Sequence, residues 1–272
     1  MAAGCAAAQA GWDVQLFERA PAFTEVGAGV QLGPNVTRIL NAWGLSDALK
    51  EVAAFPAALH ARGVKSGAVL STLPLGAAMQ TRYGAPYVSV HRADLHALLL
   101  RAAHNHGVVL QTDTTVLKAE QTLDGVTVET QFGALQQRYT GEALVVADGV
   151  WSPLRQQLLQ DGPPAYSGHL AYRTLVSQAQ LPLHLRTQDA TVWMGALAHV
   201  VVYPVRGGDF LNVVCLVEAQ AGDVDAEAIK SWTAQKTPAQ TQQDLHTALR
   251  DACTTLRALI DACHDLGPWH LW

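Results

Sequence analysis

Residues 143–155 read ALVVADGVWSPLR and predict the unit around which the fold is organised. The apolar run LVVA is typical of a buried parallel strand, which must be apolar on both faces. Asp148 and Gly149 end this run, and Ser152 followed by Pro153 is typical of a helix N-cap with proline at the first helical position. The stretch therefore predicts a strand, a tight turn and a helix, with a carboxylate just past the carboxyl end of the strand. Open α/β sheets bind their ligands at that edge.

The helix after this turn is expected to bury an apolar stripe formed by Leu154, Leu158 and Leu159. Taken alone, the segment is also compatible with an ordinary strand-to-helix turn, because Asp-Gly is common in turns. The choice between the two interpretations depends on the rest of the chain.

The composition predicts a soluble globular protein: 49% of the 272 residues are hydrophobic, 15% are charged, and the net charge is −5. The length allows two domains, and nothing is basic enough to suggest nucleic acid as a partner. No apolar run reaches the roughly 18 residues of a membrane helix, and the start lacks the basic region of a signal peptide. The scattered cysteines indicate reduced thiols in a cytoplasmic protein. His104 and His106 have no cysteine or carboxylate cluster beside them, so no metal site is predicted.

A strand followed by an acid also occurs near the start, where residues 12–17 precede Glu18. In dinucleotide-binding Rossmann units, a carboxylate after the second strand hydrogen-bonds a ribose hydroxyl. Such a unit begins with a strand and the motif G-x-G-x-x-G, whereas this sequence opens with MAAGCAAAQA, a good helix former. We therefore expect a chain that is truncated at its N-terminus and starts inside the first helix of the unit.

Residues 25–35, EVGAGVQLGPN, contain two glycines on either side of Ala28. Gly27 and Gly29 would let the backbone approach a flat ligand closely, because no side chain intervenes. A plain glycine loop before a helix that starts near Pro34 is the alternative.

The segment HRADLH, residues 91–96, opens a further predicted helix with Arg92 at its start. The guanidinium fork of arginine donates several hydrogen bonds in a fixed geometry, which suits phosphate and other oxygen-rich groups. A solvated arginine at a helix start is the alternative interpretation.

The remaining elements follow from hydrophobic periodicity and turn residues. They are a helix over 36–51, strands of a second, antiparallel sheet between 60 and 90, a strand and a β-meander over 108–139 with a turn at Asp124-Gly125, and helices over 226–262.

A second domain is predicted after Tyr166, with strands near 168–176, 191–194, 199–205 and 210–217. His199 and Tyr203 are four residues apart on the third of these strands, so their side chains are expected on one face. A neutral imidazole and a phenol over a cavity could orient and deprotonate a phenolic substrate. A core tyrosine with a surface histidine is the alternative.

Four of these segments, taken in order, closely resemble motifs of the group A FAD-dependent aromatic hydroxylases, the salicylate hydroxylase-like flavoprotein monooxygenases. They are the G-A-G loop, the H-R-x-D-L segment, the Asp-Gly turn, and HVVVYPVRGGDFLN at residues 199–212. The resemblance covers nearly the whole chain. It implies an α/β fold: a Rossmann-like, three-layer FAD-binding domain that lacks its first strand, with a second, antiparallel-sheet substrate domain. We expect residues 1–165 in the first domain, with 59–90 contributing strands to the second, and 166–272 in the second.

The resemblance also implies a role for each matching residue. His199 and Tyr203 would face the substrate. On the adenosine side of the cofactor, Glu18 would contact the ribose and Val116 the adenine. Arg92 would contact the polar chain of the flavin, and Ala28 and Gly29 would line its ring. Asp148 and Gly149 would lie near the ribityl chain and the pyrophosphate.

The implied activity is hydroxylation of a small aromatic substrate with FAD, O₂ and either NADH or NADPH, by a monomer or homodimer without nucleic acid or membrane partners. The family's G-x-G-x-x-G motif and its C-terminal G-D-A-A-H motif do not occur in this sequence. A truncated, non-catalytic remnant is therefore a second hypothesis, and we expect that the 272-residue chain by itself does not retain FAD. An NAD-dependent dehydrogenase is a third, which the Asp-Gly turn, the G-A-G loop and the H-x-x-x-Y-P strand argue against.

Overall fold

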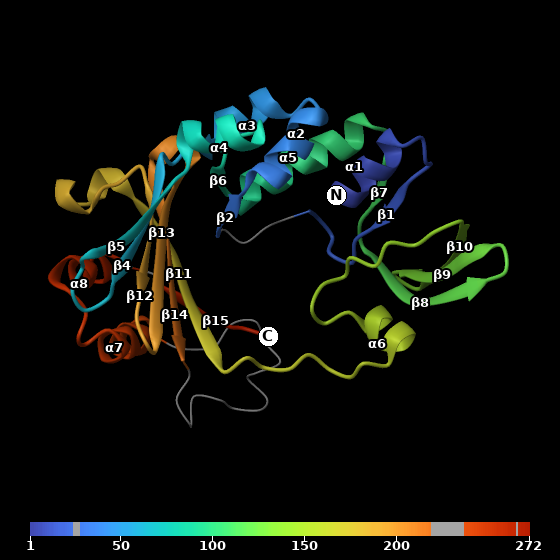
Figure 1. The fold of residues 1–272 in the computed structure, drawn as a ribbon. Coiled ribbons are helices and arrows are strands. Elements are labelled where there is room, and N and C mark those ends of the chain that lie inside the picture. Colours follow the sequence, from blue (N-terminus) through green and yellow to red (C-terminus); the bar gives the residue numbers. More distant parts are fainter. Residues whose placement is uncertain (24–27, 219–236, 265) are drawn as a thin grey trace. The chain divides into compact units, whose positions relative to one another are not determined.

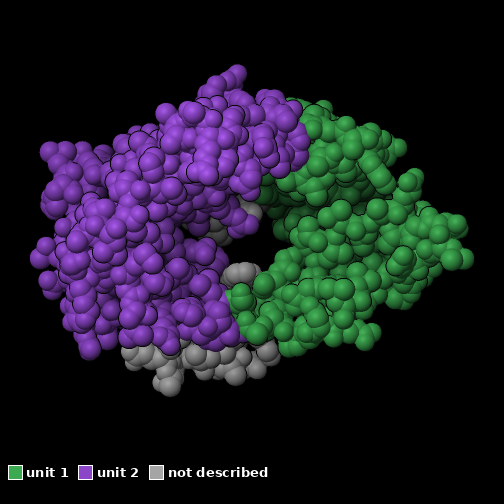
Figure 2. All heavy atoms as spheres, viewed as in Figure 1, with its two compact units in different colours: residues 1–25, 96–165, 272 green, residues 26–95, 166–271 purple. Residues whose placement is uncertain are grey.

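The computed structural model describes the chain except for residues 24–27, 219–236 and 265. It divides into two compact units, coloured separately in Figure 2. The first unit comprises residues 1–25, 96–165 and 272, and the second comprises 26–95 and 166–271. Figure 1 labels the elements of both.

The first unit contains a parallel pair of strands and an antiparallel meander. β1 (Gln15–Phe17) pairs with β7 (Val109–Gln111) in parallel, and β8 (Thr114–Thr122), β9 (Gly125–Phe132) and β10 (Leu135–Gly141) form the meander. The predicted turn between β8 and β9 is confirmed, with Gly125 at φ +143°. The helices are α1 (Ala2–Gln9) and α6 (Pro153–Leu159), and α5 (Arg92–Asn105) runs on from the second unit.

The prediction for residues 143–155 is partly confirmed and partly wrong. Ser152 is the N-cap of α6, because its Oγ accepts the Arg155 N–H at 2.8 Å, and Pro153 is the first helical residue. The predicted strand over LVVA does not form, however: Val145 is 68% exposed and these residues pair with no strand in the described part of the chain. An extended segment becomes a strand only by hydrogen-bonding to a neighbour.

The predicted apolar stripe of α6 is also wrong in part. Leu154 is buried against β8 and β9, whereas Leu158 and Leu159 are 48% and 67% exposed. The side-chain amide of Gln157 also anchors α6 to β8, because it donates to the Ala119 carbonyl at 2.8 Å and accepts the Ala119 N–H at 3.4 Å. Gln157 thus satisfies backbone groups of β8 as a neighbouring strand would.

The second unit is built on a seven-stranded sheet in the order β15-β11-β14-β13-β12-β4-β5. All neighbouring strands are antiparallel except β12 and β4, which are parallel. The strands are β4 (Ala58–Gly63), β5 (Val69–Pro74), β11 (His169–Ser177), β12 (Ala190–Met194), β13 (Ala198–Val205), β14 (Phe210–Glu218) and β15 (Gly267–His270). The predicted antiparallel sheet is therefore confirmed.

Smaller elements surround this sheet (Figure 1). A three-stranded sheet contains β2 (Gly29–Leu32), β6 (Val88–His91) and β3 (Ala53–Ala54). The helices are α2 (Pro34–Ala42), α3 (Ser46–Val52), α4 (Gly76–Tyr83), α7 (Pro238–Ala248) and α8 (Thr254–Asp261), with short 3₁₀ turns η1 (Gln178–Gln180), η2 (Leu183–Leu185) and η3 (Arg206–Gly208). The helix predicted over 36–51 is two helices, because Gly44 at φ +74° interrupts it. Of the helical stretch predicted over 226–262, the part before residue 237 lies outside the described residues.

The two faces of the large sheet differ in what covers them. One face packs against α7 and α8, and its core includes Val200, Val202 and Val213 from the strands with Leu245 and Leu256 from the helices. The opposite face carries Tyr203 and Val205, with Leu59, Leu175 and Phe210 beside them. Period-two alternation along β13 separates the two sets. The second face is where the predicted substrate residues lie.

Among the described residues, no helix reaches the length and apolarity that crossing a bilayer requires. The same residues contain no group of three or more His, Cys, Asp or Glu side chains placed to hold a metal ion.

Candidate active site

The glycine loop and the large sheet meet at Gly29, the first residue of β2. Its N–H donates to Oδ1 of Asn212 at 2.7 Å. A Cβ on Gly29 would lie 2.5 Å from Cε2 of Tyr203 and 2.9 Å from Cβ of Asn212. Tyr203 and Asn212 are direct partners across β13 and β14, so both present their side chains to this glycine. Only glycine fits there without displacing one of two buried side chains.

Asn212 was not predicted as a site residue, although the sequence carries a signal for it. It is a lone amide in the apolar strand FLNVVCLVE and is 1% exposed. Because Oδ1 accepts from Gly29, Nδ2 points the other way, and it has no hydrogen-bond partner among the described residues. A buried donor without a partner is costly, so we interpret this amide as a candidate contact for a bound molecule.

Tyr203 is 5% exposed, and its burial raises the pKa of its phenol above the ordinary value. The nearby Arg173 opposes this rise in pKa, and Tyr87 adds to it. Tyr87 is itself engaged with Oε1 of Gln31, and burial raises its pKa to about 12. Tyr203 is therefore protonated at neutral pH. It can orient a bound ring by hydrogen bonding, but it is not a base that would deprotonate one.

His199 lies on the same strand as Tyr203 and, by alternation, on the same face, but it is exposed. Four residues along a strand correspond to roughly 13 Å. The structure thus brings Tyr203, and not His199, against Gly29. A catalytic role for His199 stays a prediction.

Arg92 and Ala28 are joined through their backbones. The Arg92 N–H donates to the Ala28 carbonyl at 2.8 Å, and this bond extends the pairing of β2 with β6. Arg92 begins α5 and its side chain is exposed. The predicted H-R segment and the part of the G-A-G loop that is described are therefore adjacent, while Gly27 lies outside the described residues.

A salt bridge ties the same H-R segment to the turn after β13. Arg206 donates to both carboxylate oxygens of Asp94, at 2.9 and 3.2 Å, and its Nη2 lies 3.4 Å from Nδ1 of His91. Ser89 adds a hydrogen bond from its Oγ to the Pro204 carbonyl. These contacts fix the H-R segment to the end of β13, although Asp94 and Arg206 are 112 residues apart in the sequence.

We expect His91 to make stability depend on pH. Burial, and then the charge of Arg206, lower the pKa of His91, while Asp94 acts in the opposite direction. The unfolded chain takes up a proton near pH 6.5, whereas the folded chain takes it up only at lower pH, so the free energy of unfolding should fall as pH drops below about 6.5. Urea unfolding at pH 7.5 and 5.5 should show a smaller fall in His91→Gln than in the wild type. Equal falls in both proteins would contradict this assignment.

The predicted adenosine-side residues belong to the first unit. Glu18 directly follows β1, and its Oε1 accepts the Ala20 N–H at 2.9 Å, which orients the carboxylate at the carboxyl end of that strand. Val116 is half-buried in β8 and packs near Leu154. Asp148 is exposed and follows no strand, so the prediction that it lies at a strand's carboxyl end is wrong for this structure. Gly149 has φ +88°, a conformation that side chains disfavour, and no atom lies within 4 Å of where its Cβ would be.

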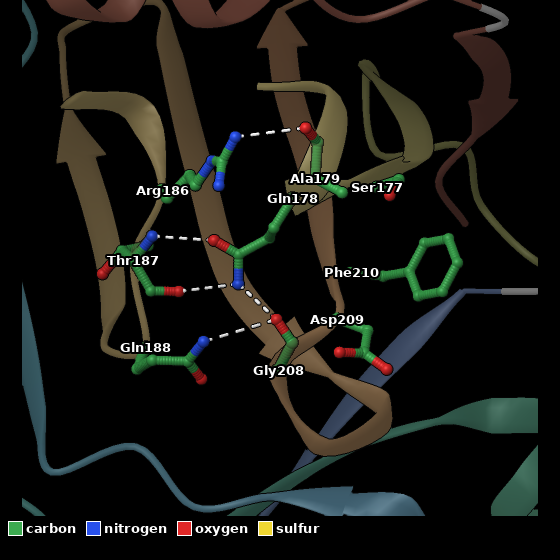
Figure 3. Close-up of a pocket in the computed structure, with 9 residues that line it drawn as sticks. All are labelled: Ser177, Gln178, Ala179, Arg186, Thr187, Gln188, Gly208, Asp209 and Phe210. Carbon is green, nitrogen blue, oxygen red and sulfur yellow. Dashed lines mark hydrogen bonds between the residues drawn. The ribbon is translucent and has the colours of Figure 1, made fainter. Parts of the chain in front are cut away.

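A separate hollow of about 650 Å³ lies where β11 and β14 meet the 3₁₀ turns. Figure 3 shows that the side chains of Gln178, Arg186 and Gln188 join the loops around it by hydrogen bonds. Gln178 donates to the Thr187 and Gly208 carbonyls and accepts the Thr187 N–H, and Arg186 donates to the Ala179 and Leu181 carbonyls. We interpret this hollow as structural, because the side chains of Gln178, Arg186 and Gln188 are hydrogen-bonded to backbone groups around it.

Residues 1–262 match a protein family described as FAD binding domain. The chain belongs to this family. Among the curated relatives, 3-hydroxybenzoate 6-hydroxylase of Polaromonas naphthalenivorans (strain CJ2) is 32% identical over 270 residues, which are 99% of this chain and 64% of that protein. The 6-hydroxynicotinate 3-monooxygenase of Bordetella bronchiseptica is 33% identical over 269 residues, 97% of this chain and 66% of that protein.

A solved structure, Klebsiella pneumoniae HpxO complexed with FAD and uric acid, superposes with a TM-score of 0.78 at 22% identity. The match covers 98% of this chain and 64% of that one. This likeness establishes the fold of the FAD-binding family for the chain. The chain spans about two thirds of the length of these relatives. The resemblance to FAD-dependent aromatic hydroxylases is confirmed.

Proposed function

We propose that the protein containing this chain is an FAD-dependent monooxygenase that hydroxylates a small phenolic or hydroxybenzoate-like aromatic, with NADH or NADPH and O₂ as co-substrates. The observation that carries the proposal is the contact of Gly29 with Tyr203 and Asn212. Gly29 belongs to the loop predicted to run beside a flat ring, and it lies against a sheet face that carries a buried, protonated phenol and an amide donor without a partner among the described residues. The names of the relatives, which act on hydroxybenzoate and hydroxynicotinate, support the same reaction class.

The chain's residues fit FAD. Glu18 would bind the adenosine ribose, Val116 would contact the adenine, and the open backbone of Gly149 next to Asp148 would admit the ribityl and pyrophosphate region. Bound FAD would supply the redox chemistry, namely acceptance of electrons from the nicotinamide and transfer of one oxygen atom of O₂ to the aromatic ring.

The protein's own contribution is to bind and orient. Ala28 and Gly29 would lie along the flavin ring, with Arg92 near its polar chain. Tyr203 would hold the aromatic substrate through its hydroxyl, and His199 would face the substrate from the other end of β13. We further propose a cytoplasmic monomer or homodimer that needs neither nucleic acid nor a membrane.

The test is product analysis with isotopically labelled oxygen. The purified protein, saturated with FAD, would be given NADH or NADPH and a panel of hydroxybenzoates and hydroxypyridine carboxylates under ¹⁸O₂. We expect substrate-stimulated oxidation of the nicotinamide and one labelled oxygen atom in the aromatic product. NAD(P)H oxidation that no aromatic compound stimulates, with no labelled product, would argue for the non-catalytic alternative.

A further inference from the structure

Arg206, in the turn between β13 and β14, has a backbone conformation that its residue type disfavours. Its φ is +53°, in the left-handed region where a Cβ crowds the backbone, and Gly207 and Gly208 after it have φ +67° and +99°. Glycine adopts this conformation without strain, and two of these three positions are glycine. Strain at a position that glycine could occupy indicates that the side chain has a use there. We therefore examined what the Arg206 side chain contacts.

The guanidinium of Arg206 contacts the segment that begins α5. It donates to both carboxylate oxygens of Asp94, at 2.9 and 3.2 Å, and its Nη2 lies 3.4 Å from Nδ1 of His91. The side chain of Asp94 is only 23% exposed, so the ion pair is partly shielded from solvent. An arginine that binds a carboxylate through two parallel hydrogen bonds fixes its orientation as well as its distance. The pair therefore holds the turn and the start of α5 in one relative position.

This ion pair joins the two sets of residues that the proposed function uses, all within the second unit. Arg92, which would lie near the polar chain of the flavin, is two residues before Asp94, and its N–H donates to the Ala28 carbonyl at 2.8 Å. Tyr203, which would hold the substrate, is three residues before Arg206 near the end of β13. Helices and strands transmit a constraint at their ends because their own geometry is fixed. The ion pair therefore constrains the distance between the flavin contacts and the substrate contacts.

We propose that Arg206 is a positioning residue: through Asp94 it holds β13, which carries Tyr203, at a fixed distance from the flavin contacts, and so sets the fraction of oxidised NAD(P)H that yields hydroxylated product. The inference rests on the proposed function, to which it adds the residues that couple the two half-reactions. A bound substrate that is misplaced by about 1 Å reacts roughly 100-fold more slowly. Loss of the ion pair would therefore slow oxygen transfer to the aromatic ring.

Two overall reactions compete for the electrons of NAD(P)H. In the coupled reaction, NAD(P)H, a proton, O₂ and the aromatic substrate give NAD(P)⁺, water and the hydroxylated product. In the uncoupled reaction, NAD(P)H, a proton and O₂ give NAD(P)⁺ and hydrogen peroxide. Only the first needs an aligned aromatic ring. Misplacement of the substrate strand should therefore appear as hydrogen peroxide formed in place of product.

The experiment measures product, hydrogen peroxide and NAD(P)H consumed by the purified, FAD-saturated protein, with the aromatic acid of the ¹⁸O₂ panel that the wild type hydroxylates. Arg206→Gly and Asp94→Ala each remove the ion pair. We expect each variant to form roughly fivefold less product per NAD(P)H, with the difference recovered as hydrogen peroxide. Fivefold corresponds to about 1 kcal/mol, the upper end for an ion pair that solvent reaches.

The backbone strain at Arg206 separates positioning from stability. Arg206→Gly relieves the left-handed strain as it removes the ion pair, whereas Asp94→Ala only removes the pair. Urea unfolding should therefore give a higher midpoint for Arg206→Gly than for Asp94→Ala, although both lose the same fraction of product. Asp94→Glu keeps the carboxylate and should recover part of the product yield.

A second measurement does not depend on turnover. Addition of the aromatic acid to the oxidised, FAD-saturated protein without NAD(P)H should perturb the flavin absorbance of the wild type, because the ring binds beside the flavin. At saturating acid, the perturbation should be smaller in Arg206→Gly and Asp94→Ala, with unchanged FAD content. Asp251→Ala is the matched control: it breaks the Lys65–Asp251 ion pair of 3.0 Å, which joins the β4–β5 turn to the loop after α7. It should behave as wild type in both measurements.

A wild-type yield of product per NAD(P)H in Arg206→Gly would overturn this inference and leave the proposed function intact. Losses of product that follow the urea midpoints, larger in Asp94→Ala than in Arg206→Gly, would also overturn it, by showing that the ion pair acts only on stability. Hydroxylation of no panel compound by the wild type would overturn the proposed function and this inference together.

Discussion

Tyr203→Phe should lower kcat/KM for aromatic hydroxylation by about 100-fold, the loss expected when a bound substrate is misplaced by about 1 Å, without loss of bound FAD. The substitution removes only the hydroxyl, while the ring that packs beside Gly29 and Val205 stays. Since burial keeps this phenol protonated, the variant should lose orientation of the substrate and not a titrating base. The pH profile of the residual activity should therefore keep its shape. Steady-state kinetics and the flavin absorbance of the purified variant measure both quantities.

Tyr87→Phe is the matched control, because Tyr87 is also a partly buried phenol in this region but its hydroxyl is engaged with Gln31. It should change kcat/KM far less than Tyr203→Phe does. Parallel losses of FAD content and activity in Tyr203→Phe would show a structural role for the hydroxyl. The interpretation of Tyr203 as a substrate-orienting group would then be wrong.

Gly29→Ala should destabilise the second unit by about 1–3 kcal/mol, the usual range for an added methyl in a packed site. The new Cβ would overlap the ring of Tyr203 and the side chain of Asn212, both of which are buried. Relief requires either a shift of β2 or loss of the Gly29–Asn212 hydrogen bond. We therefore expect a lower urea midpoint together with weaker retention of FAD, because Ala28 and Gly29 move together.

Gly76→Ala provides the comparison within the same unit. Its Cβ would meet only Ala57, at 3.5 Å or more, which is ordinary van der Waals contact, and it lies at the start of α4, where alanine is favoured over glycine. An unchanged urea midpoint in Gly29→Ala, equal to that of Gly76→Ala, would show that the site accommodates a side chain.

Local patterns predicted the features of this chain that depend on a few neighbouring residues. Ser152 and Pro153 begin α6 as expected, and Asp124-Gly125 makes the predicted turn, because capping and turn geometry depend on adjacent residues. The strand over LVVA failed for the opposite reason: its apolar composition is suitable, but a strand also needs a hydrogen-bonded neighbour, which is a property of the fold.

In the candidate site, too, local spacing predicted some features and could not predict others. The even spacing of His199 and Tyr203 predicted that both lie on one face of the strand. It could not predict how deeply each is buried, and the structure shows His199 exposed and Tyr203 buried. Asn212 acquires its importance from Gly29, which lies 183 residues away in the sequence. A polar residue within an apolar strand was the available signal, and periodicity alone does not distinguish a ligand contact from a surface residue.

The parallel pairing of β4 with β12 has a consequence for how the protein is synthesised. Asp189, which lies 131 residues after Ala58 in the chain, accepts the N–H of Ala58. The hairpin β4–β5 therefore has no neighbouring strand beside β4 until β12 leaves the ribosome. At about 5–20 residues per second, that interval lasts roughly 7–26 s. Nascent chains stalled before residue 190 should therefore be cleaved by protease in the hairpin, and chains stalled well beyond Glu218 should resist. During this interval β5 presents apolar side chains and unpaired backbone groups to other chains, and Leu70 remains 62% exposed even in the finished fold, so we expect the stalled chains to aggregate more readily than the complete protein.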